Sequence, residues 1–191
     1  MSTSRIRIRN LAEGAVMIAL AFVLSFVKLF SLPQGGSVTL AMVPLVIMAF
    51  RHGAKWGCAT AFVYGILKLI LGFENVMYCN TLLAQIGCVL LDYLVAYTVL
   101  GLAPVFAGSA KQNRVAGVLI GTCVAGILRF VCSFLSGWLL WGSYAPEGQG
   151  AVLYSLIYNG SYMLPNIVIA AVVVCILAKT APKVIFNKTG D

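Results

Sequence analysis

The stretch WGSYAPEGQGAVLYSLIYNG, residues 141–160, separates two long apolar runs. Each run is long enough for a helix that crosses the roughly 30 Å hydrocarbon core of a bilayer, which takes about 20 apolar residues. The connection between the runs carries one carboxylate, Glu147, and no lysine or arginine, which is typical of a loop on the outer side of a membrane. The whole stretch also gathers a proline turn, an asparagine and four aromatic rings, more than a reversal of the chain requires: Trp141, Tyr144, Tyr154 and Tyr158.

The composition of the whole chain indicates a membrane protein. Of its 191 residues, 61% are hydrophobic and 9% are charged, and the mean hydropathy is +0.99. A soluble domain is about half apolar and about a quarter charged. The basic start, residues 1–10, precedes an apolar run without a small-residue cleavage site. We therefore predict a retained first helix rather than a signal peptide.

The basic residues are concentrated in alternate connections. A net charge of +8 would indicate nucleic-acid binding in a soluble protein. Here ten of the thirteen basic residues flank the apolar runs at every second connection: Arg5, Arg7, Arg9, Arg51, Lys55, Lys111, Arg114, Lys179, Lys183 and Lys188. The intervening loops hold Glu74 and Glu147 and no lysine or arginine. This positive-inside pattern predicts an even number of spans, both termini in the cytoplasm and no nucleic-acid partner.

We therefore predict an all-α integral membrane protein, a six-helix bundle that forms a single domain over residues 1–191. The expected transmembrane spans are 10–30, 38–51, 53–73, 77–106, 113–142 and 150–179. The second is unusual because its uncharged run, 38–50, has only 13 residues and contains Pro44. Such a run gives about 20 Å of helix against a hydrocarbon core of about 30 Å. Either this helix is short and shielded by its neighbours, or part of the adjoining loop enters the membrane inside the protein.

Metal, cofactor and enzymatic chemistry find no support in the sequence. The six cysteines show no C-x-x-C spacing and the only histidine is His52, so we predict no metal site and no disulfide framework. No G-x-x-x-x-G-K-[ST] sequence is present, so the chain lacks the P-loop route to ATP hydrolysis. His52 lies in a basic cytoplasmic connection, which argues against a Ser–His protease. We expect a protein that is not an enzyme and uses no cofactor.

Four charged residues of the predicted spans raise functional hypotheses, because charge inside a bilayer is costly. Lys28 and Lys68 lie near the outer ends of their spans, where a long side chain reaches the membrane surface. Asp92 and Arg129 lie deeper. They form either a structural ion pair or part of a cavity in which Asp92 supplies negative charge for a cationic ligand.

Rings and polar groups near these charges favour the cavity. One helical face of the fifth span carries, at steps of four residues, Arg129, Ser133, Gly137 and Trp141. In the sixth span Tyr154 and Tyr158 are one turn apart, with Asn159 beside them. An aromatic face holds a flat cation with about 1–2 kcal/mol when desolvated, and a carboxylate adds a charge-assisted hydrogen bond.

Four segments together resemble a known family: LPQGGSVTLAMVP (32–44), LLDYLVAYTVLGLA (90–103), RFVCSFLSGWLLWGSYAPEG (129–148) and LYSLIYNGSYMLP (153–165). They are similar to the thiamin-specific substrate-binding subunits, or S-components, of energy-coupling factor (ECF) transporters, over nearly the whole chain. The resemblance implies a multi-pass bacterial cell-membrane protein that binds thiamin tightly at the outer face and has no ATPase of its own. Inward delivery then requires a shared transmembrane coupling protein and two cytoplasmic ATPases.

The resemblance also implies roles for individual residues. The acidic residue and tyrosine of the family's pocket match Asp92 and Tyr93, and its basic residue matches Arg129. Its stacking tryptophan, tyrosine and asparagine match Trp141, Tyr154 and Asn159. The expected ligand site therefore consists of Asp92, Tyr93, Arg129, Ser133, Gly137, Trp141, Tyr154 and Asn159.

Two further positions bear on partners and specificity. The A-x-x-x-A pattern by which the family's first helix contacts the coupling protein matches Ala15 and Ala19. Ser133 departs from the family, which has a histidine there, one turn after the basic residue. Serine donates a hydrogen bond but does not stack on a ring, so this difference bears on the choice between thiamin and a precursor or analogue.

Other functions remain open at this point. The chain could be an S-component for another small vitamin, which a panel of vitamins in a binding assay would reveal. An autonomous proton-coupled carrier would use Asp92 and Arg129 as a relay and would need no ATP. A structural membrane subunit would use the same two residues as a buried tie and would bind no small molecule.

Overall fold

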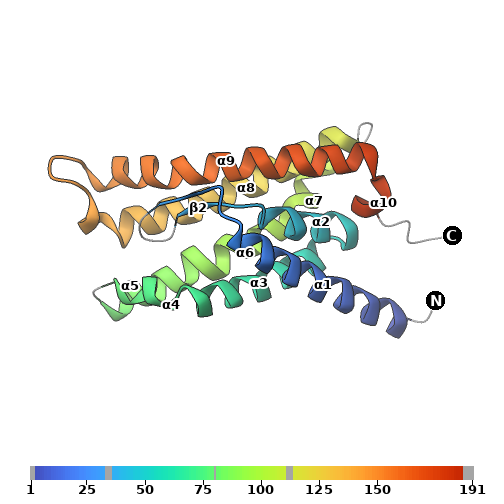
Figure 1. Cartoon of the computed structure of the whole chain (residues 1–191), viewed down its shortest axis with the longest axis horizontal. Coiled ribbons are helices and arrows are strands. Elements are labelled where there is room, and N and C mark those ends of the chain that lie inside the picture. The colour runs from blue at the N-terminus through green and yellow to red at the C-terminus, as the bar shows by residue number, and fades with distance from the viewer. Residues whose placement is uncertain (1–2, 33–35, 80, 111–113, 187–191) are drawn as a thin grey trace.

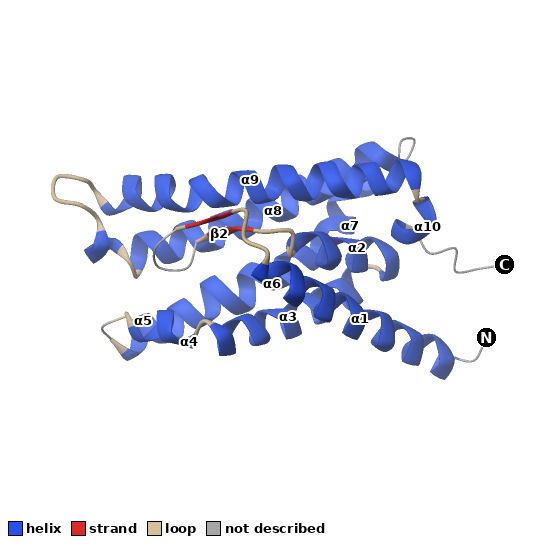
Figure 2. Cartoon of the chain, in the orientation of Figure 1, coloured by secondary structure: helices blue, strands red, loops and turns tan. Residues whose placement is uncertain are grey.

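The computed structural model of the chain describes residues 3–32, 36–79, 81–110 and 114–186. Residues 33–35, between the first two apolar runs, lie outside this part, as do the basic Lys111 and Lys188 of the charge pattern. Across the described residues the fold is nearly all helical, and a two-stranded hairpin accompanies the helices (Figure 2).

Long apolar helices make up most of the molecule. Within the described residues, five are long and apolar enough to cross a membrane: α1 (Thr3–Phe26), α3 (Ala54–Leu71), the continuous helix Leu82–Phe106, α8 (Arg114–Leu139) and α9 (Ala151–Thr180). Large apolar side chains on them face outward, such as Val16, which is 64% exposed, and Leu83, which is 81% exposed. Such extensive apolar surface indicates contact with lipid. The two longest helices, α8 and α9, lie side by side (Figure 1).

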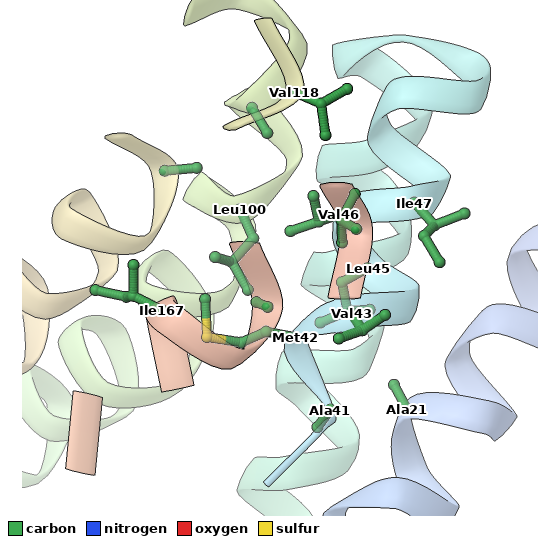
Figure 3. Close-up of a cluster of buried hydrophobic side chains, with 14 of the residues drawn as sticks. Ala21, Ala41, Met42, Val43, Leu45, Val46, Ile47, Leu100, Val118 and Ile167 are labelled. Carbon is green, nitrogen blue, oxygen red and sulfur yellow. The ribbon is translucent and has the colours of Figure 1, made fainter. Parts of the chain in front are cut away.

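The second apolar run forms a short helix in the middle of the bundle. This helix, α2 (Met42–His52), has 11 residues, and residues 42–49 are all buried. Its length is about 16 Å at 1.5 Å per residue, too short to cross a bilayer alone. Pro44 lies in the first turn, where no backbone hydrogen bond is lost. The structure thus has the short helix shielded by its neighbours, with Val46 on the side that faces Leu100 and Val118 of other helices (Figure 3).

The fourth expected span is helical but irregular. It is preceded by a short helix, α4 (Phe73–Met77), and begins at Leu82 rather than at residue 77. Its consecutive segments are α5 (Leu82–Cys88), the π-helical η2 (Val89–Val95), α6 (Ala96–Thr98), the 3-10 helix η3 (Val99–Leu102) and α7 (Ala103–Phe106), after which η4 (Ala107–Ala110) follows. Single π-helical turns inside α-helices are rare and frequently occur at functional sites. The π-helical turn here contains Asp92 and Tyr93.

Close helix contacts depend on glycines. A Cβ atom at Gly101 would lie 2.1 Å from the Cys58 backbone nitrogen, so η3 and α3 approach backbone to backbone. A Cβ at Gly121 would lie 2.2 Å from the Ala103 carbonyl oxygen, which brings α8 equally close to α7. Small residues at such crossings allow helices to pack tightly where lipid supplies no hydrophobic driving force.

A small hairpin between α1 and α2 lies against α9. Strand β1 (Phe30–Ser31) pairs antiparallel with β2 (Ser37–Val38), with Phe30 opposite Val38. Asn166 of α9 holds the end of the hairpin, because its side chain accepts from the Thr39 backbone N–H at 2.9 Å and donates to the Ser37 carbonyl at 2.8 Å. These bonds fix the hairpin beside the middle of α9.

The two ends of the bundle differ in composition. The start of α1 and the short helix α10 (Pro182–Ile185) lie at one end of the bundle (Figure 1). At the opposite end, η5 (Gly142–Tyr144) lies in the connection between α8 and α9. At the first end Glu13 accepts hydrogen bonds from Arg51, and His52 Nε2 lies 2.7 Å from the same carboxylate. Arg51 also donates to the Lys183 carbonyl at 2.6 Å. This polar cluster, which sequence analysis did not anticipate, connects α1, α2 and α10.

Candidate ligand-binding site

A cavity of about 280 Å³ opens among the helices on the side of the α8–α9 connection. Its wall includes all eight residues expected at the ligand site: Asp92, Tyr93, Arg129, Ser133, Gly137, Trp141, Tyr154 and Asn159. They come from the π-helical turn, from one face of α8 and its end, and from α9. Segments up to 67 positions apart in the chain, 92 to 159, therefore meet around one space.

Asp92 is the only carboxylate among the described residues that line the cavity. The Ser136 hydroxyl donates a hydrogen bond to Asp92 Oδ2, and the Cys88 Sγ lies 3.4 Å from the same oxygen. Both partners are buried. The π-helical turn and these contacts fix the carboxylate in position, where it can balance a cation or accept a hydrogen bond from a ligand.

Arg129 faces the cavity without pairing with Asp92. Its guanidinium carbon lies 4.3 Å from the centre of the Tyr97 ring, a cation–π contact. Its buried Nε has no hydrogen-bond partner among the described residues, and no ion pair within that part of the chain joins it to Asp92. The hypothesis of a structural tie between the two residues is therefore not supported.

Aromatic rings form much of the cavity wall. The Trp141 ring lies against Tyr144, with centroids 5.6 Å apart. Along α9 the rings of Tyr154, Tyr158 and Tyr162 follow one another, with centroid distances of 5.8 and 5.9 Å. Their four-residue spacing places them on one face of the helix. A flat ligand would therefore meet rings from α9 and the Trp141 ring from the segment just after α8.

A close helix contact controls the position of Asn159. A Cβ atom at Gly137 would lie 2.7 Å from Asn159 Nδ2 and 2.3 Å from Ser155 Oγ, so only glycine leaves room for both side chains. Asn159 donates to the Ser155 carbonyl at 3.0 Å and accepts from the Tyr162 hydroxyl at 2.8 Å. Gly137 thus lets the polar side of α9 approach α8 directly.

Tyr93 and Ser133 complete the expected set. The Tyr93 hydroxyl donates to the Gly72 carbonyl at 2.9 Å and so fixes its ring against the end of α3. Ser133 is buried in the cavity wall.

All six cysteines are free. The described residues contain no group of three or more His, Cys, Asp or Glu side chains that could hold a metal ion.

Sequence analysis missed several lining residues. Lys28 and Lys68, which we expected to reach only the membrane surface, line the cavity. The C-terminal ends of α1 and α3 border this space, and the two lysines lie at those ends. Their position at the ends of apolar runs was the only indication that the sequence offered. Tyr97, another lining residue, and Ser136, which contacts Asp92 from behind the wall, were missed because only tertiary contacts bring them to Arg129 and Asp92.

Comparison with known families gives the chain its classification. The family described as "Thiamine transporter protein (Thia_YuaJ)" matches residues 11–186. The chain belongs to this thiamine transporter family. The sequence resemblance to thiamin-specific S-components is thereby confirmed, and with it the prediction of a multi-pass cell-membrane protein of bacterial type.

Individual members of the family are similar over almost their whole length. The thiamine transporter ThiT of Bacillus subtilis is 36% identical, covering 92% of this chain and 93% of its own. ThiT of Lacticaseibacillus paracasei is 31% identical, covering 93% of this chain and 90% of its own. The solved structure of ThiT from Listeria monocytogenes superposes with a TM-score of 0.78 at 26% identity, covering 94% of this chain and 98% of that one.

Proposed function

We propose that this protein is the thiamin-binding S-component of an ECF vitamin importer, which captures thiamin at the outer face of the membrane. One observation carries the proposal. In a member of the thiamine transporter family, one cavity brings a fixed carboxylate together with aromatic rings from several helices. The proposal does not involve catalysis, because binding and delivery need no chemical change of the vitamin.

The chemistry of thiamin fits these side chains. Thiamin joins a permanently cationic thiazolium ring to an aminopyrimidine ring, so it needs surfaces for stacking and an acceptor for its amino group. Trp141 supplies the stacking surface, and Asp92 supplies the acceptor and counter-charge. Tyr154 and Asn159 act as polar anchors. Small-ligand sites of this kind are mostly concave and apolar, with few polar groups that fix orientation.

The proposed topology has six membrane helices with both termini in the cytoplasm. The five long helices and the short α2 account for the six. The connections near the α8–α9 end carry Glu74, on the short helix α4, and Glu147, and the opposite end carries the arginines that begin α1. This distribution supports an orientation in which the cavity is reached from outside the cell.

The proposed partners are a transmembrane coupling protein and two cytoplasmic ATPases. The chain itself has no P-loop sequence, so energy for delivery comes from those partners. Ala15 and Ala19 both lie on the exposed side of α1. A face of small side chains lets another helix approach closely within lipid, as contact with a coupling protein requires.

A thiamin titration of the purified protein tests the proposal. Tryptophan fluorescence should be quenched saturably as thiamin stacks on Trp141. Trp141→Phe should lose most of the quenching, whereas Trp138→Phe should keep it, because Trp138 is 43% exposed and does not line the cavity. Absence of saturable thiamin binding to the wild-type protein would refute the function, and full quenching in Trp141→Phe would refute the site.

A further inference from the structure

Helix α1 is the least buried of the long helices. Of its apolar stretch, 22% is buried, which is the smallest share among the five long helices of the described residues. The residues that it contributes to the apolar core are Met17, Ile18, Ala21 and Phe22. The part of α1 that precedes Met17 therefore needs other contacts to hold it against the bundle.

A polar network centred on Glu13 supplies these contacts. Arg51 Nε donates to Glu13 Oε2 at 2.5 Å, and His52 Nε2 lies 2.7 Å from the same oxygen. Both partners belong to the last turn of α2, and the His52 side chain is only 2% exposed. Hydrogen bonds that involve a charged group are shorter and stronger than those between neutral groups. The carboxylate thus connects α1 firmly to the end of α2.

Asn10 extends the network to α3. Its amide takes the orientation in which the oxygen accepts from Trp56 Nε1 at 3.0 Å and the nitrogen donates to His52 Nδ1 at 3.0 Å, because an indole N–H can only donate. His52 Nδ1 is then an acceptor, so its Nε2 carries the proton and donates to Glu13. Asn10 is buried. The amide and the imidazole ring are therefore held by partners from α1, α2 and α3.

Arg51 also reaches the last helix. It donates to the carbonyl of Lys183 at 2.6 Å and to that of Val184 at 3.3 Å, and both belong to α10. Helix α10 is anchored further by Ile185, whose side chain is fully buried. Helices α1, α2, α3 and α10 thus meet in one set of polar side chains, the Glu13 network, which consists of Asn10, Glu13, Arg51, His52 and Trp56.

The network holds one face of α1 and leaves the opposite face exposed. The buried and half-buried positions of α1 recur at steps of three and four residues and include Asn10, Glu13, Met17 and Ala21. Ala15 and Ala19 are exposed. At 3.6 residues per turn they lie about 200° and 240° around the helix from Glu13. Contacts that fix the inner face therefore also fix the direction in which the Ala15–Ala19 face points.

Stability alone does not call for a network of this kind. Taking charged groups out of water costs free energy that their attraction often only offsets, and apolar side chains of similar size often stabilise a protein as well or better. A buried network in which the polar groups have partners does fix one arrangement of the elements that it joins. The Glu13 network is therefore suited to set the orientation of α1.

We propose that the Glu13 network positions α1 for contact with the coupling protein, so that Glu13, Arg51 and His52 act on transport through the Ala15–Ala19 face. The inference rests on the proposed function. Small residues let helices in lipid approach closely, and such a contact forms only when the small face points toward the partner. A helix whose orientation is fixed beforehand also loses less conformational freedom on binding. Among the described residues that line the cavity, none belongs to the network, so thiamin binding should not depend on it.

The test compares the wild type with Glu13→Gln and the control Glu74→Gln. Glutamine keeps the size of the side chain, but it gives up the charge and replaces one acceptor oxygen with a donor. Glu74 lies on α4 near the opposite end of the bundle, is exposed, and forms no ion pair within the described residues. The control therefore makes the same change of charge outside the network. Trp56→Phe is a milder second variant, because it keeps an aromatic ring and removes the N–H that donates to Asn10.

Three quantities are measured for each protein. Hydrogen–deuterium exchange of the backbone amides of residues 5–14 reports how firmly the first half of α1 is held. Titration with thiamin gives the dissociation constant of the vitamin. Titration with the purified coupling module of the same bacterium, the transmembrane coupling protein with its two ATPases, gives the dissociation constant of the complex.

The expected result is a loss of partner binding without a loss of thiamin binding. Glu13→Gln should speed exchange in residues 5–14 and weaken binding of the coupling module about tenfold, within the usual range of coupling between sites. Its dissociation constant for thiamin should equal that of the wild type. Trp56→Phe should act in the same direction with a smaller effect, and Glu74→Gln should change none of the three quantities.

Other results overturn the inference in distinguishable ways. Unchanged exchange in Glu13→Gln would mean that the network does not hold α1. Faster exchange with unchanged affinity for the coupling module would mean that the network does not position α1 for this partner. A parallel loss of thiamin affinity would assign the network to the stability of the whole fold, and the positioning role would be wrong. If the wild type binds neither thiamin nor the coupling module, the proposed function fails and the inference with it.

Discussion

Replacing Gly137 by alanine tests whether the α8–α9 contact determines the ligand site. The added Cβ would lie 2.3 Å from Ser155 Oγ and 2.7 Å from Asn159 Nδ2, both far inside van der Waals contact. The Ser155 hydroxyl donates a hydrogen bond to the Phe134 carbonyl at 2.7 Å, which holds it in place. Asn159 is 5% exposed and has the cavity beside it. The amide of Asn159 must therefore move, and the open direction is into the ligand space.

The size of the effect follows from the bonds that this movement breaks. Asn159 would lose its hydrogen bonds to the Ser155 carbonyl and from the Tyr162 hydroxyl. Each neutral hydrogen bond contributes about 0.5–1.5 kcal/mol, so the loss is about 2 kcal/mol. A loss of about 2 kcal/mol in the free energy of thiamin binding corresponds to an affinity about 30-fold lower.

Thiamin titration of purified Gly137→Ala measures this loss, with the melting temperature recorded beside it to detect misfolding. The matched control is Gly160→Ala, one residue from Asn159 on the same helix, where an added Cβ meets no atom within 4 Å. We expect wild-type affinity in the control. If Gly137→Ala binds thiamin as tightly as the control does, Asn159 is not an anchor and the reasoning is refuted.

Further predictions concern the carboxylate, the stacking ring, the hairpin and the partner face. Asp92→Asn and Trp141→Ala should each weaken thiamin binding at least tenfold, about 1.4 kcal/mol, in the same titration, and unchanged affinity in both would refute the site. Ser37 and Thr39 of the hairpin end line the cavity, so Asn166→Ala, which removes the bonds that hold this end, should speed thiamin dissociation about tenfold in stopped-flow fluorescence, and an unaltered rate would contradict this. Leucine at both Ala15 and Ala19 should abolish ATP-driven uptake in vesicles containing the coupling proteins while thiamin binding persists, and normal uptake would exclude this face as the contact.

The sequence predicts the long helices well because lipid imposes a simple rule. Apolar runs of sufficient length must become helices, since only helices satisfy their own backbone inside a bilayer. The π-helical turn from Val89 to Val95 follows no such rule. It needs one extra residue per turn, and tertiary contacts of Asp92 and Tyr93 with other helices accompany it. No local pattern in the residues around it marks that turn.

The sequence placed residues of α8 on one wall of the cavity because they share a helical period, and it gave no such indication for the lysines. Arg129, Ser133 and Gly137 follow one another at steps of four on one face of α8, and Trp141 comes one further step along, just after the helix. Lys28 and Lys68 have no such relation, because they come from different helices. Near the end of a span, a lysine that reaches the membrane surface and a lysine that lines a cavity have the same sequence signature.

The four rings of residues 141–160 divide into two groups, which explains their number. Trp141, Tyr154 and Tyr158 line the cavity, and Tyr144 does not. Instead, the Tyr144 hydroxyl donates to the Tyr78 carbonyl at 3.1 Å, and its ring packs on Trp141 with centroids 5.6 Å apart. A stacking surface is effective only if its own orientation is fixed before the ligand arrives, because ordering a mobile ring reduces the binding free energy. Three rings therefore face the cavity, and the fourth packs on Trp141 from outside it.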